Sequence, residues 1–298
     1  MGFSRSLQIW AGQIRAPFLL LAVLLVLIAG AVALYDGVFH GLNFGLAMFG
    51  TVLAHIDVNL FNELSDHKTG IDNNTRRTPF SGGSGTLQAG HLSPRKVLTV
   101  TLVVSAIALG IGIYLTVVSG WHLILFILAG AIATVFYTTH LARWVLGELI
   151  AGLCLGTFVV LGAYYAQAGF ITSSIVWLSI PPGILTALLL LLNEFPDAEA
   201  DRQGGRRHLV IVLGWRKAAI VYAAAMALGY LLLIIGVVAS WLPPTVLLAL
   251  LTLPLALKSS LTALKYGRNF EKMVPALGAN VGVVLGTDLL IAVAYFIQ

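Results

Sequence analysis

Two short acidic patterns in the sequence have the residue types of a metal and phosphate site. Each reads Asn-Glu-x-x-Asp, carries one further aspartate downstream and is followed by a pair of arginines. The first comprises Asn62, Glu63, Asp66, Asp72, Arg76 and Arg77, and the second comprises Asn193, Glu194, Asp197, Asp201, Arg206 and Arg207. Such oxygen ligands suit Mg²⁺, which also binds substrate phosphates, and the planar arginine fork matches phosphate oxygens. The patterns therefore predict a site for Mg²⁺ and a diphosphate, whose charge the ions would neutralise as it leaves.

The spacing within each pattern places the polar side chains on one side of a helix, because residues three or four apart share a face. That face holds Asn59, Asn62, Glu63 and Asp66 in the first pattern and Asn193, Asp197 and Asp201 in the second. Pro196 predicts that the second helix kinks or ends there. The alternative interpretation is a pair of solvated helix caps whose acids pair with the nearby arginines. Because the same pentad occurs twice, each time before Arg-Arg, we favour a functional site.

The composition excludes a soluble globular protein. Of 298 residues, 59% are hydrophobic and 10% are charged, and the mean hydropathy is +0.95. These values are typical of a membrane protein with many spans. The formal net charge of +5 is interpreted as a signal of membrane topology and not of nucleic-acid binding. The single cysteine, Cys154, excludes an intrachain disulfide.

Nine apolar stretches are long enough to cross a bilayer, which takes about 20 helical residues. They lie at approximately 17–35, 42–63, 97–118, 121–139, 147–168, 174–195, 217–239, 243–258 and 276–297. The first resembles a signal peptide but is long for one, so we predict an uncleaved membrane helix. The predicted fold is all-α, a single membrane-embedded domain over 1–298. Helices one to four and five to eight would form pseudo-repeats, with a ninth helix added.

The distribution of charge supports this division into spans. The N-terminus and the loops after the second, fourth, sixth and eighth helices contain all 17 lysines and arginines, and the opposite loops contain none. By the positive-inside rule these segments face the cytoplasm. We therefore predict a multi-pass protein of the cell (inner) membrane with a cytoplasmic N-terminus and an active site facing the cytoplasm. Carboxylates at the edge of membrane spans are costly, which favours a functional interpretation of both acidic patterns.

The two patterns, at the ends of the second and sixth of nine helices, resemble those of the UbiA superfamily of intramembrane prenyltransferases. The resemblance extends over essentially the whole chain, including Arg15-Ala16-Pro17-Phe18 before the first helix. It implies transfer of a polyprenyl group from its diphosphate to an acceptor, usually aromatic, with Mg²⁺. It also implies that Asp66, Asp72, Asp197 and Asp201 are catalytic and that they bind metal together with Asn62, Asn193 and Glu63, which replaces the family's usual aspartate.

Further residues are candidates for substrate contacts. The resemblance implies diphosphate contacts by Asn62, Asn193, Lys68, Arg76, Arg77, Arg206 and Arg207, with a solvated loop as the alternative for Lys68. The family's Tyr-x-x-x-Lys after the fourth helix is replaced by Tyr137-Thr138-Thr139-His140, so His140 or Arg143 is a candidate for the lysine's role. Tyr137, Tyr164 and Tyr165 could stabilise an allylic cation, or simply pack. His55 and Asp57 could act on the acceptor or form structural hydrogen bonds, and the loop Ser81–Gly85 could cap the site.

The predicted function is Mg²⁺-dependent transfer of a polyprenyl group to an aromatic acceptor within the membrane, of the quinone or menaquinone-precursor type. Gly147-Glu148-Leu149, and the glycine between Thr69 and Asp72, resemble the 1,4-dihydroxy-2-naphthoate branch of the family. The predicted partners are a polyprenyl diphosphate, a hydrophobic or aromatic acceptor and the lipid bilayer. Alternatives within the family are a glycerol-phosphate lipid or a porphyrin-type ring as acceptor. A transporter is disfavoured because the acids cluster at one membrane face and not at the midplane.

Overall fold

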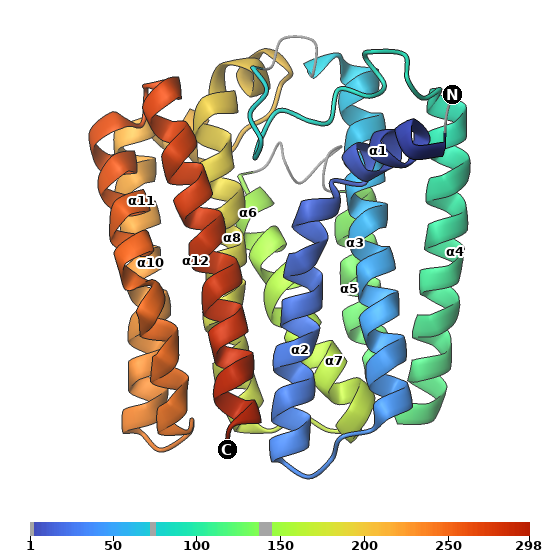
Figure 1. Ribbon diagram of the computed structural model, residues 1–298, viewed down its shortest axis with the longest axis vertical. Coiled ribbons are helices and arrows are strands. Elements are labelled where there is room, and N and C mark those ends of the chain that lie inside the picture. Colours follow the sequence, from blue (N-terminus) through green and yellow to red (C-terminus); the bar gives the residue numbers. More distant parts are fainter. Residues whose placement is uncertain (1–2, 72–75, 137–144) are drawn as a thin grey trace.

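The protein is a bundle of long, nearly parallel helices (Figure 1). The computed structural model describes residues 3–71, 76–136 and 145–298, which contain helices and loops but no strand. The two ends of the chain lie at opposite ends of the bundle (Figure 1). The helices, in chain order, are α1 (Phe3–Gln13), η1 (Ala16–Phe18), α2 (Leu19–Tyr35), α3 (Gly41–Thr69), α4 (Pro94–Ser119), α5 (Leu123–Phe136), α6 (Gly147–Gly152), η4 (Leu153–Thr157), α7 (Phe158–Ala168), α8 (Ser173–Gln203), α9 (Leu209–Leu213), α10 (Trp215–Val238), η5 (Pro244–Thr252), α11 (Leu253–Tyr266) and α12 (Phe270–Phe296).

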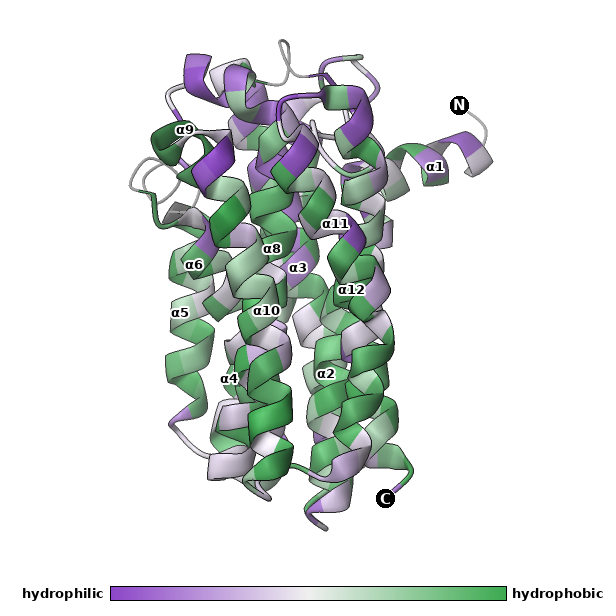
Figure 2. Ribbon diagram, turned by 90° about the vertical axis from the view of Figure 1, so that its left-hand side faces the viewer, coloured by the Kyte–Doolittle hydropathy of each residue, from purple (hydrophilic) through white to green (hydrophobic). Residues whose placement is uncertain are grey.

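The helices agree with the predicted membrane spans. Within the described residues, eight helical segments are long and apolar enough to cross a bilayer, and α5 is a shorter apolar helix at the place of the remaining predicted span. The apolar residues form a broad band along the bundle, and the hydrophilic ones concentrate at one end (Figure 2). The all-α prediction is thus confirmed, and the chain is a multi-pass integral membrane protein.

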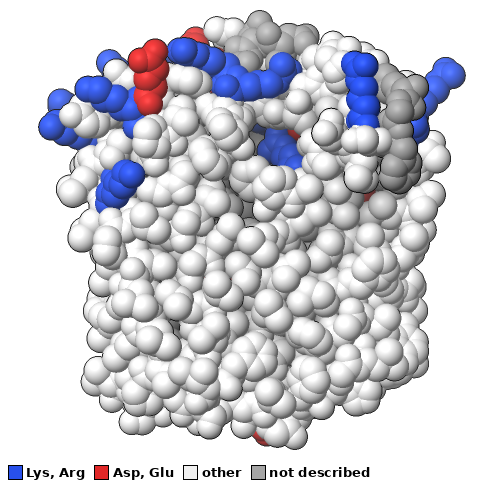
Figure 3. Space-filling view, viewed as in Figure 1, with Lys and Arg blue, Asp and Glu red and all other residues white. Residues whose placement is uncertain are grey.

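The basic side chains concentrate at the same end as the hydrophilic segments. In the face shown in Figure 3, lysines and arginines surround the upper end of the bundle and leave its apolar sides free. This is the end at which α3 and α8 finish, so both acidic patterns lie among the cationic groups. Anionic ligands that approach this end would therefore be attracted by several positive charges.

Both pattern-bearing helices are longer than predicted. Helix α3 continues to Thr69 and is closed by Gly70 in the left-handed conformation (φ 75°). Helix α8 runs through Pro196 to Gln203, so of the two predicted alternatives, a kink or an end at the proline, the end is excluded. A proline removes one backbone hydrogen bond, but α8 packs against α6, η4, α10 and α12 along its length. Apart from Asp72, which lies outside the described residues, the acids of both patterns consequently lie on helix turns.

Two other spans depart from regular α-helix. The span from Gly147 to Ala168 contains a π-helical segment, η4. There the backbone approaches α8 closely: a Cβ on Gly156 would lie 2.7 Å from the Cα of Gly183, and one on Gly152 would lie 2.6 Å from the Gly183 carbonyl oxygen. The span from Pro244 to Tyr266 begins as the 3-10 helix η5 and continues as α11. Glycines thus allow α6 and η4 to hold Glu148 beside α8.

We expect Gly156→Ala to destabilise the protein by about 1–3 kcal/mol, the usual cost of an overpacked contact. The added methyl group meets backbone atoms of α8, so no side-chain rotation relieves the clash. The measurement is thermal unfolding in detergent or nanodiscs. Gly110→Ala is the matched control, because a Cβ on this helical glycine meets nothing within 4 Å. Equal unfolding temperatures for the two variants would contradict the close packing of η4 on α8.

Candidate diphosphate and metal site

A polar cavity of about 130 Å³ lies where the last turns of α3 and α8 face each other. Its lining includes Asn62 and Asp66 from α3, and Asn193, Glu194, Asp197 and Asp201 from α8. The remaining polar lining residues are Arg15, Ser81, Arg206, Arg207 and His208. The structure therefore brings the two acidic patterns, which are far apart in sequence, around one cavity.

Four buried oxygen atoms in this lining have no hydrogen-bond partner among the residues that the structure describes. They are the Oδ1 atoms of Asn62, Asn193 and Asp197 and the Oε2 atom of Glu194. A buried polar atom without a partner is costly. Amide and carboxylate oxygens are also the ligands that suit Mg²⁺. The donor set of the cavity therefore fits the predicted metal.

Arg206 connects the two patterns directly. Its Nη2 donates a hydrogen bond to Asp66 Oδ1 on α3, and its Nη1 donates to Asp201 Oδ1 on α8 at 2.9 Å. Both carboxylates are more than nine-tenths buried, and two like charges at this depth need a cation between them. Arg206 supplies that cation and fixes the separation of the two helices. It is also placed to contact a phosphate in the cavity.

Glu63 was predicted as a metal ligand, but both of its oxygens accept hydrogen bonds from protein groups. Oε1 accepts from the Arg15 Nε at 3.2 Å and from the Ser84 backbone N–H at 2.8 Å, and Oε2 accepts from the Ser84 hydroxyl at 2.6 Å. These contacts favour a different role for Glu63, in which it fastens the loop Phe80–Gly83, part of the cavity wall, and orients Arg15.

Arg15 is a cavity residue that the site prediction did not include. It follows α1 in the left-handed conformation (φ 51°), which is uncommon for a residue with a side chain. The preceding carbonyl, of Ile14, accepts a hydrogen bond from Asn59 Nδ2 at 2.9 Å, and the Gln13 side chain accepts one from the hydroxyl of Thr86, which follows the loop Ser81–Gly85. The turn between α1 and η1 is thereby fixed against α3. The signal in the sequence was the Arg-Ala-Pro-Phe segment before the first span.

The other predicted contact residues differ in their positions. Arg207 lines the cavity. Arg76 and Arg77 do not line it: the Arg76 guanidinium lies 4.1 Å from the ring centroid of Phe270, and that of Arg77 packs against Gly85. Lys68 is exposed. Three further predicted residues, Asp72, Tyr137 and His140, lie outside the described residues.

Tyr164 and Tyr165 pack away from the polar cavity. The Tyr164 hydroxyl donates to Asp36 at 2.6 Å, and the Tyr165 hydroxyl is 3.2 Å from His122 Nδ1. Both partners belong to the end of the bundle opposite the polar cavity, since Asp36 caps the C-terminus of α2 and His122 precedes α5. These contacts support the packing interpretation of the two tyrosines.

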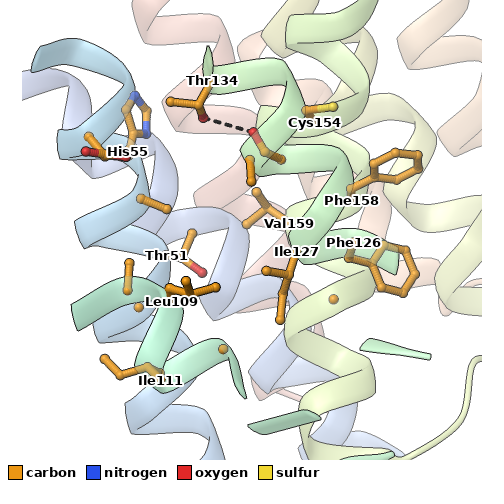
Figure 4. Close-up of a pocket in the computed structure, with 18 of the residues that line it drawn as sticks. Thr51, His55, Leu109, Ile111, Phe126, Ile127, Thr134, Cys154, Phe158 and Val159 are labelled. Carbon is orange, nitrogen blue, oxygen red and sulfur yellow. Dashed lines mark hydrogen bonds between the residues drawn. The ribbon is translucent and has the colours of Figure 1, made fainter. Parts of the chain in front are cut away.

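A larger apolar cavity, about 370 Å³, lies between α3, α4, α5 and the η4–α7 segment. Figure 4 shows side chains of these helices, among them Leu109, Phe126 and Phe158, facing it. Its few polar groups include His55 and Asp57, and Asp57 accepts a hydrogen bond from Ser105 at 2.8 Å. Phe61 lines this cavity whereas the next residue, Asn62, lines the polar one. The two cavities are therefore neighbours along α3.

Residues 22–273 match the model of the UbiA prenyltransferase family. The 1,4-dihydroxy-2-naphthoate octaprenyltransferase of Bacillus subtilis is 33% identical over 239 residues, which is 77% of this chain and 75% of that protein. The apo structure of a UbiA homologue from Aeropyrum pernix has a TM-score of 0.69 at 22% identity, covering 91% of this chain and 97% of that one. A UbiA homologue from Archaeoglobus fulgidus bound to GPP and Mg²⁺ has a TM-score of 0.57 at 13% identity, covering 97% of this chain and 100% of that one.

The two similar structures show that the fold is shared, whereas the family match covers most of the sequence. The chain belongs to the UbiA prenyltransferase family and is a membrane-embedded prenyltransferase.

Proposed function

We propose that the protein transfers a polyprenyl group from its diphosphate to an aromatic acceptor of the dihydroxynaphthoate type, in a reaction that requires Mg²⁺. The observation that carries the proposal is the polar cavity, where unpartnered oxygens from two helices face arginines beside an apolar cavity. The naphthoate octaprenyltransferase of Bacillus subtilis supports the acceptor class, and the homologue bound to GPP and Mg²⁺ supports the donor and the metal.

The residues of the polar cavity have complementary roles in this proposal. Asn62, Asn193 and Asp197 would hold Mg²⁺ through their unpartnered oxygens, with Asp66 and Asp201 completing the acidic set. We further propose Asp72, outside the described residues, as part of that set. When bound, Mg²⁺ neutralises the diphosphate while the bond to the allylic carbon breaks.

The cationic and capping residues act on the diphosphate itself. Arg15, Arg206 and Arg207 reach the cavity and offer N–H donors that match phosphate oxygens. The loop Phe80–Gly83, held by Glu63 through Ser84, covers the cavity and keeps water from the allylic cation. The acceptor carbon then forms the new bond, and a proton, or CO₂ from a carboxylated carbon, leaves the ring. Pyrophosphate is the second product.

The polyprenyl tail would occupy the apolar cavity, which begins at the turn of α3 that bears Phe61. Apolar side chains are about as apolar as lipid tails, so an isoprenoid chain can pass from the bilayer into this cavity without contacting water. Asp57, which accepts a hydrogen bond from the Ser105 hydroxyl, is a polar group partway along this otherwise apolar cavity. The polar end of the bundle would face the cytoplasm, because the basic residues concentrate there.

The proposal is tested by pyrophosphate release from the purified full-length protein. Polyprenyl diphosphates of several lengths are supplied with 1,4-dihydroxy-2-naphthoate, 4-hydroxybenzoate, a glycerol-phosphate lipid or a porphyrin-type acceptor. We expect release only with Mg²⁺ present, its loss on chelation, and the fastest turnover with the naphthoate. Turnover restricted to the lipid or porphyrin acceptor would overturn the acceptor class, and turnover that is unaffected by chelation would overturn the metal requirement.

We expect Ala54→Phe to shorten the donors that the enzyme accepts. Ala54 lines the apolar cavity one residue before His55, farther than His55 from the turn that carries Phe61, so a phenyl ring would obstruct the distal part of the cavity. Transfer from an octaprenyl donor should fall at least about tenfold, equivalent to about 1.4 kcal/mol of lost binding, while transfer from geranyl diphosphate changes less. Ala106→Phe is the matched control, because Ala106 is exposed on α4 and does not line the cavity. Equal losses with both donors would contradict the tail position.

A further inference from the structure

A second cluster of ligand-type side chains shares Glu194 and His208 with the lining of the polar cavity and extends from there to Glu148. Glu148 lies in the first turn of α6, Glu194 lies on α8, and His208 precedes α9. Each offers one potential ligand atom, and these atoms all lie within 4.8 Å of one another. The exposed fractions of the three residues are 5%, 8% and 4%. The cluster is therefore a buried meeting point of three separate segments.

The cluster contains side-chain atoms that lack hydrogen-bond partners among the described residues. They are Glu148 Oε2, Glu194 Oε2 and both ring nitrogens of His208. The other Glu148 oxygen is held by the Leu209 backbone N–H at 2.8 Å, which aligns this carboxylate toward the cluster. Two carboxylates this close and this deeply buried repel each other unless a cation or a proton lies between them.

The separation of two of these atoms suits a shared metal ion. His208 Nδ1 is 3.4 Å from Glu194 Oε2, and neither atom has a hydrogen-bond partner among the described residues. Two ligands about 2.0–2.2 Å from one tetrahedral ion stand about 3.4 Å apart. The opposite ring nitrogen, Nε2, is 3.4 Å from Asp201 Oδ2. A histidine that binds metal through one nitrogen commonly directs its other N–H toward a carboxylate.

We infer that Glu148, Glu194 and His208 form a binding site for a second divalent cation, a transition metal such as Zn²⁺, beside the proposed Mg²⁺ site. The imidazole nitrogen selects a softer ion than Mg²⁺, whose proposed ligands are all oxygens. The ion would link α6, α8 and the start of α9, and through His208 it would orient Asp201. The inference does not depend on the proposed acceptor or on the transfer reaction.

The test counts metal ions and needs no activity. Metal-stripped full-length protein is incubated with Zn²⁺ in an excess of Mg²⁺, which occupies the oxygen-only site, and is then desalted. We expect about one zinc per chain in the wild type and in the Asp197→Asn control, whose substitution lies in the polar cavity but outside the cluster. Glu194→Gln and His208→Asn should each retain less than about a tenth of that amount, because a three-ligand site loses one ligand.

Wild-type protein that retains no zinc would overturn the inference and would indicate a proton shared by the two glutamates. Retention by Glu194→Gln and His208→Asn, or equal loss from Asp197→Asn, would also overturn it. If the cluster variants do not fold, pulsed electron paramagnetic resonance of Mn²⁺ bound to the wild type tests whether the cluster binds a metal ion. Coupling to an imidazole nitrogen is expected from the cluster, and a signal from oxygen ligands alone would overturn the site. A failed transfer assay with intact zinc binding would affect only the proposed function.

Discussion

Replacing Asp197 with asparagine is expected to lower kcat/KM for prenyl transfer by about 10²–10³, the range seen when one group that stabilises developing charge is removed. The carboxylate of Asp197 combines a buried, unpartnered Oδ1 with a place on the cavity wall. Asparagine has nearly the same shape, so the variant removes a charge and leaves the packing of α8 in place. Its Mg²⁺ requirement should shift to higher concentration as well.

The control for Asp197→Asn is Glu199→Gln, two residues farther along α8. Glu199 is exposed and makes an i,i+3 ion pair of 3.8 Å with Arg202, a kind of contact that contributes little. Steady-state pyrophosphate release at several Mg²⁺ concentrations compares the two variants with the wild type. A near-normal kcat/KM of Asp197→Asn would show that Asp197 is not one of the Mg²⁺ ligands. Asp66→Asn is tested in parallel, and a near-normal kcat/KM of that variant would exclude Asp66 in the same way.

Replacing Arg206 with methionine is expected to have a comparable effect on transfer and an additional effect on stability. The substitution leaves Asp66 and Asp201 facing each other without the guanidinium that bridges them. Breaking a buried ion pair by removing one partner costs about 3–5 kcal/mol, and the diphosphate loses a donor on the cavity wall. Arg206→Lys should lie between the wild type and the methionine variant, because a lysine keeps the charge but not the planar fork.

Arg202→Met is the matched control for Arg206, since Arg202 is an exposed arginine on the last turn of α8. Thermal unfolding and the KM for the diphosphate are measured for both variants. We expect the unfolding temperature of Arg206→Met, but not that of Arg202→Met, to fall clearly below the wild type. Coincident unfolding curves would show that the bridge between α3 and α8 does not hold the two helices together.

The fold was predictable because membrane spans have a strong sequence signal. Length and hydropathy located the membrane spans but not the short helices α1 and α9, and the segregation of lysine and arginine indicated one polar end. Propensity alone misjudged α8, where packing on both sides outweighs the hydrogen bond lost at Pro196. The π-helical segment η4 was not predictable, because it depends on how closely glycine backbones of two spans approach.

The site was predictable in its acids and less so in its arginines. Spacing groups the acids on helix faces, and the structure places Asp66, Asp197 and Asp201 around one cavity. Adjacency in sequence does not reveal where a loop arginine points, so Arg76 was assigned to the site whereas it stacks on Phe270. Glu148 and His208 needed tertiary structure, because they lie about 60 residues apart and meet only when α6 packs beside α9.

The turn at Arg15 has a practical consequence for anyone preparing this protein. Helix α1 lies across the bundle axis near the polar end and projects from the side of the bundle (Figures 1 and 2), and it leads through Gln13 and Ile14 to Arg15 of the cavity wall. An affinity tag or fusion partner at the α1 end could displace the segment that holds Arg15 in the wall of the polar cavity. The Gln298 end lies at the other side of the bilayer-spanning bundle. A fusion at the Gln298 end is therefore expected to leave the transfer kinetics unchanged. Comparing kcat/KM for fusions at the two ends would measure how much the position of α1 affects the polar cavity.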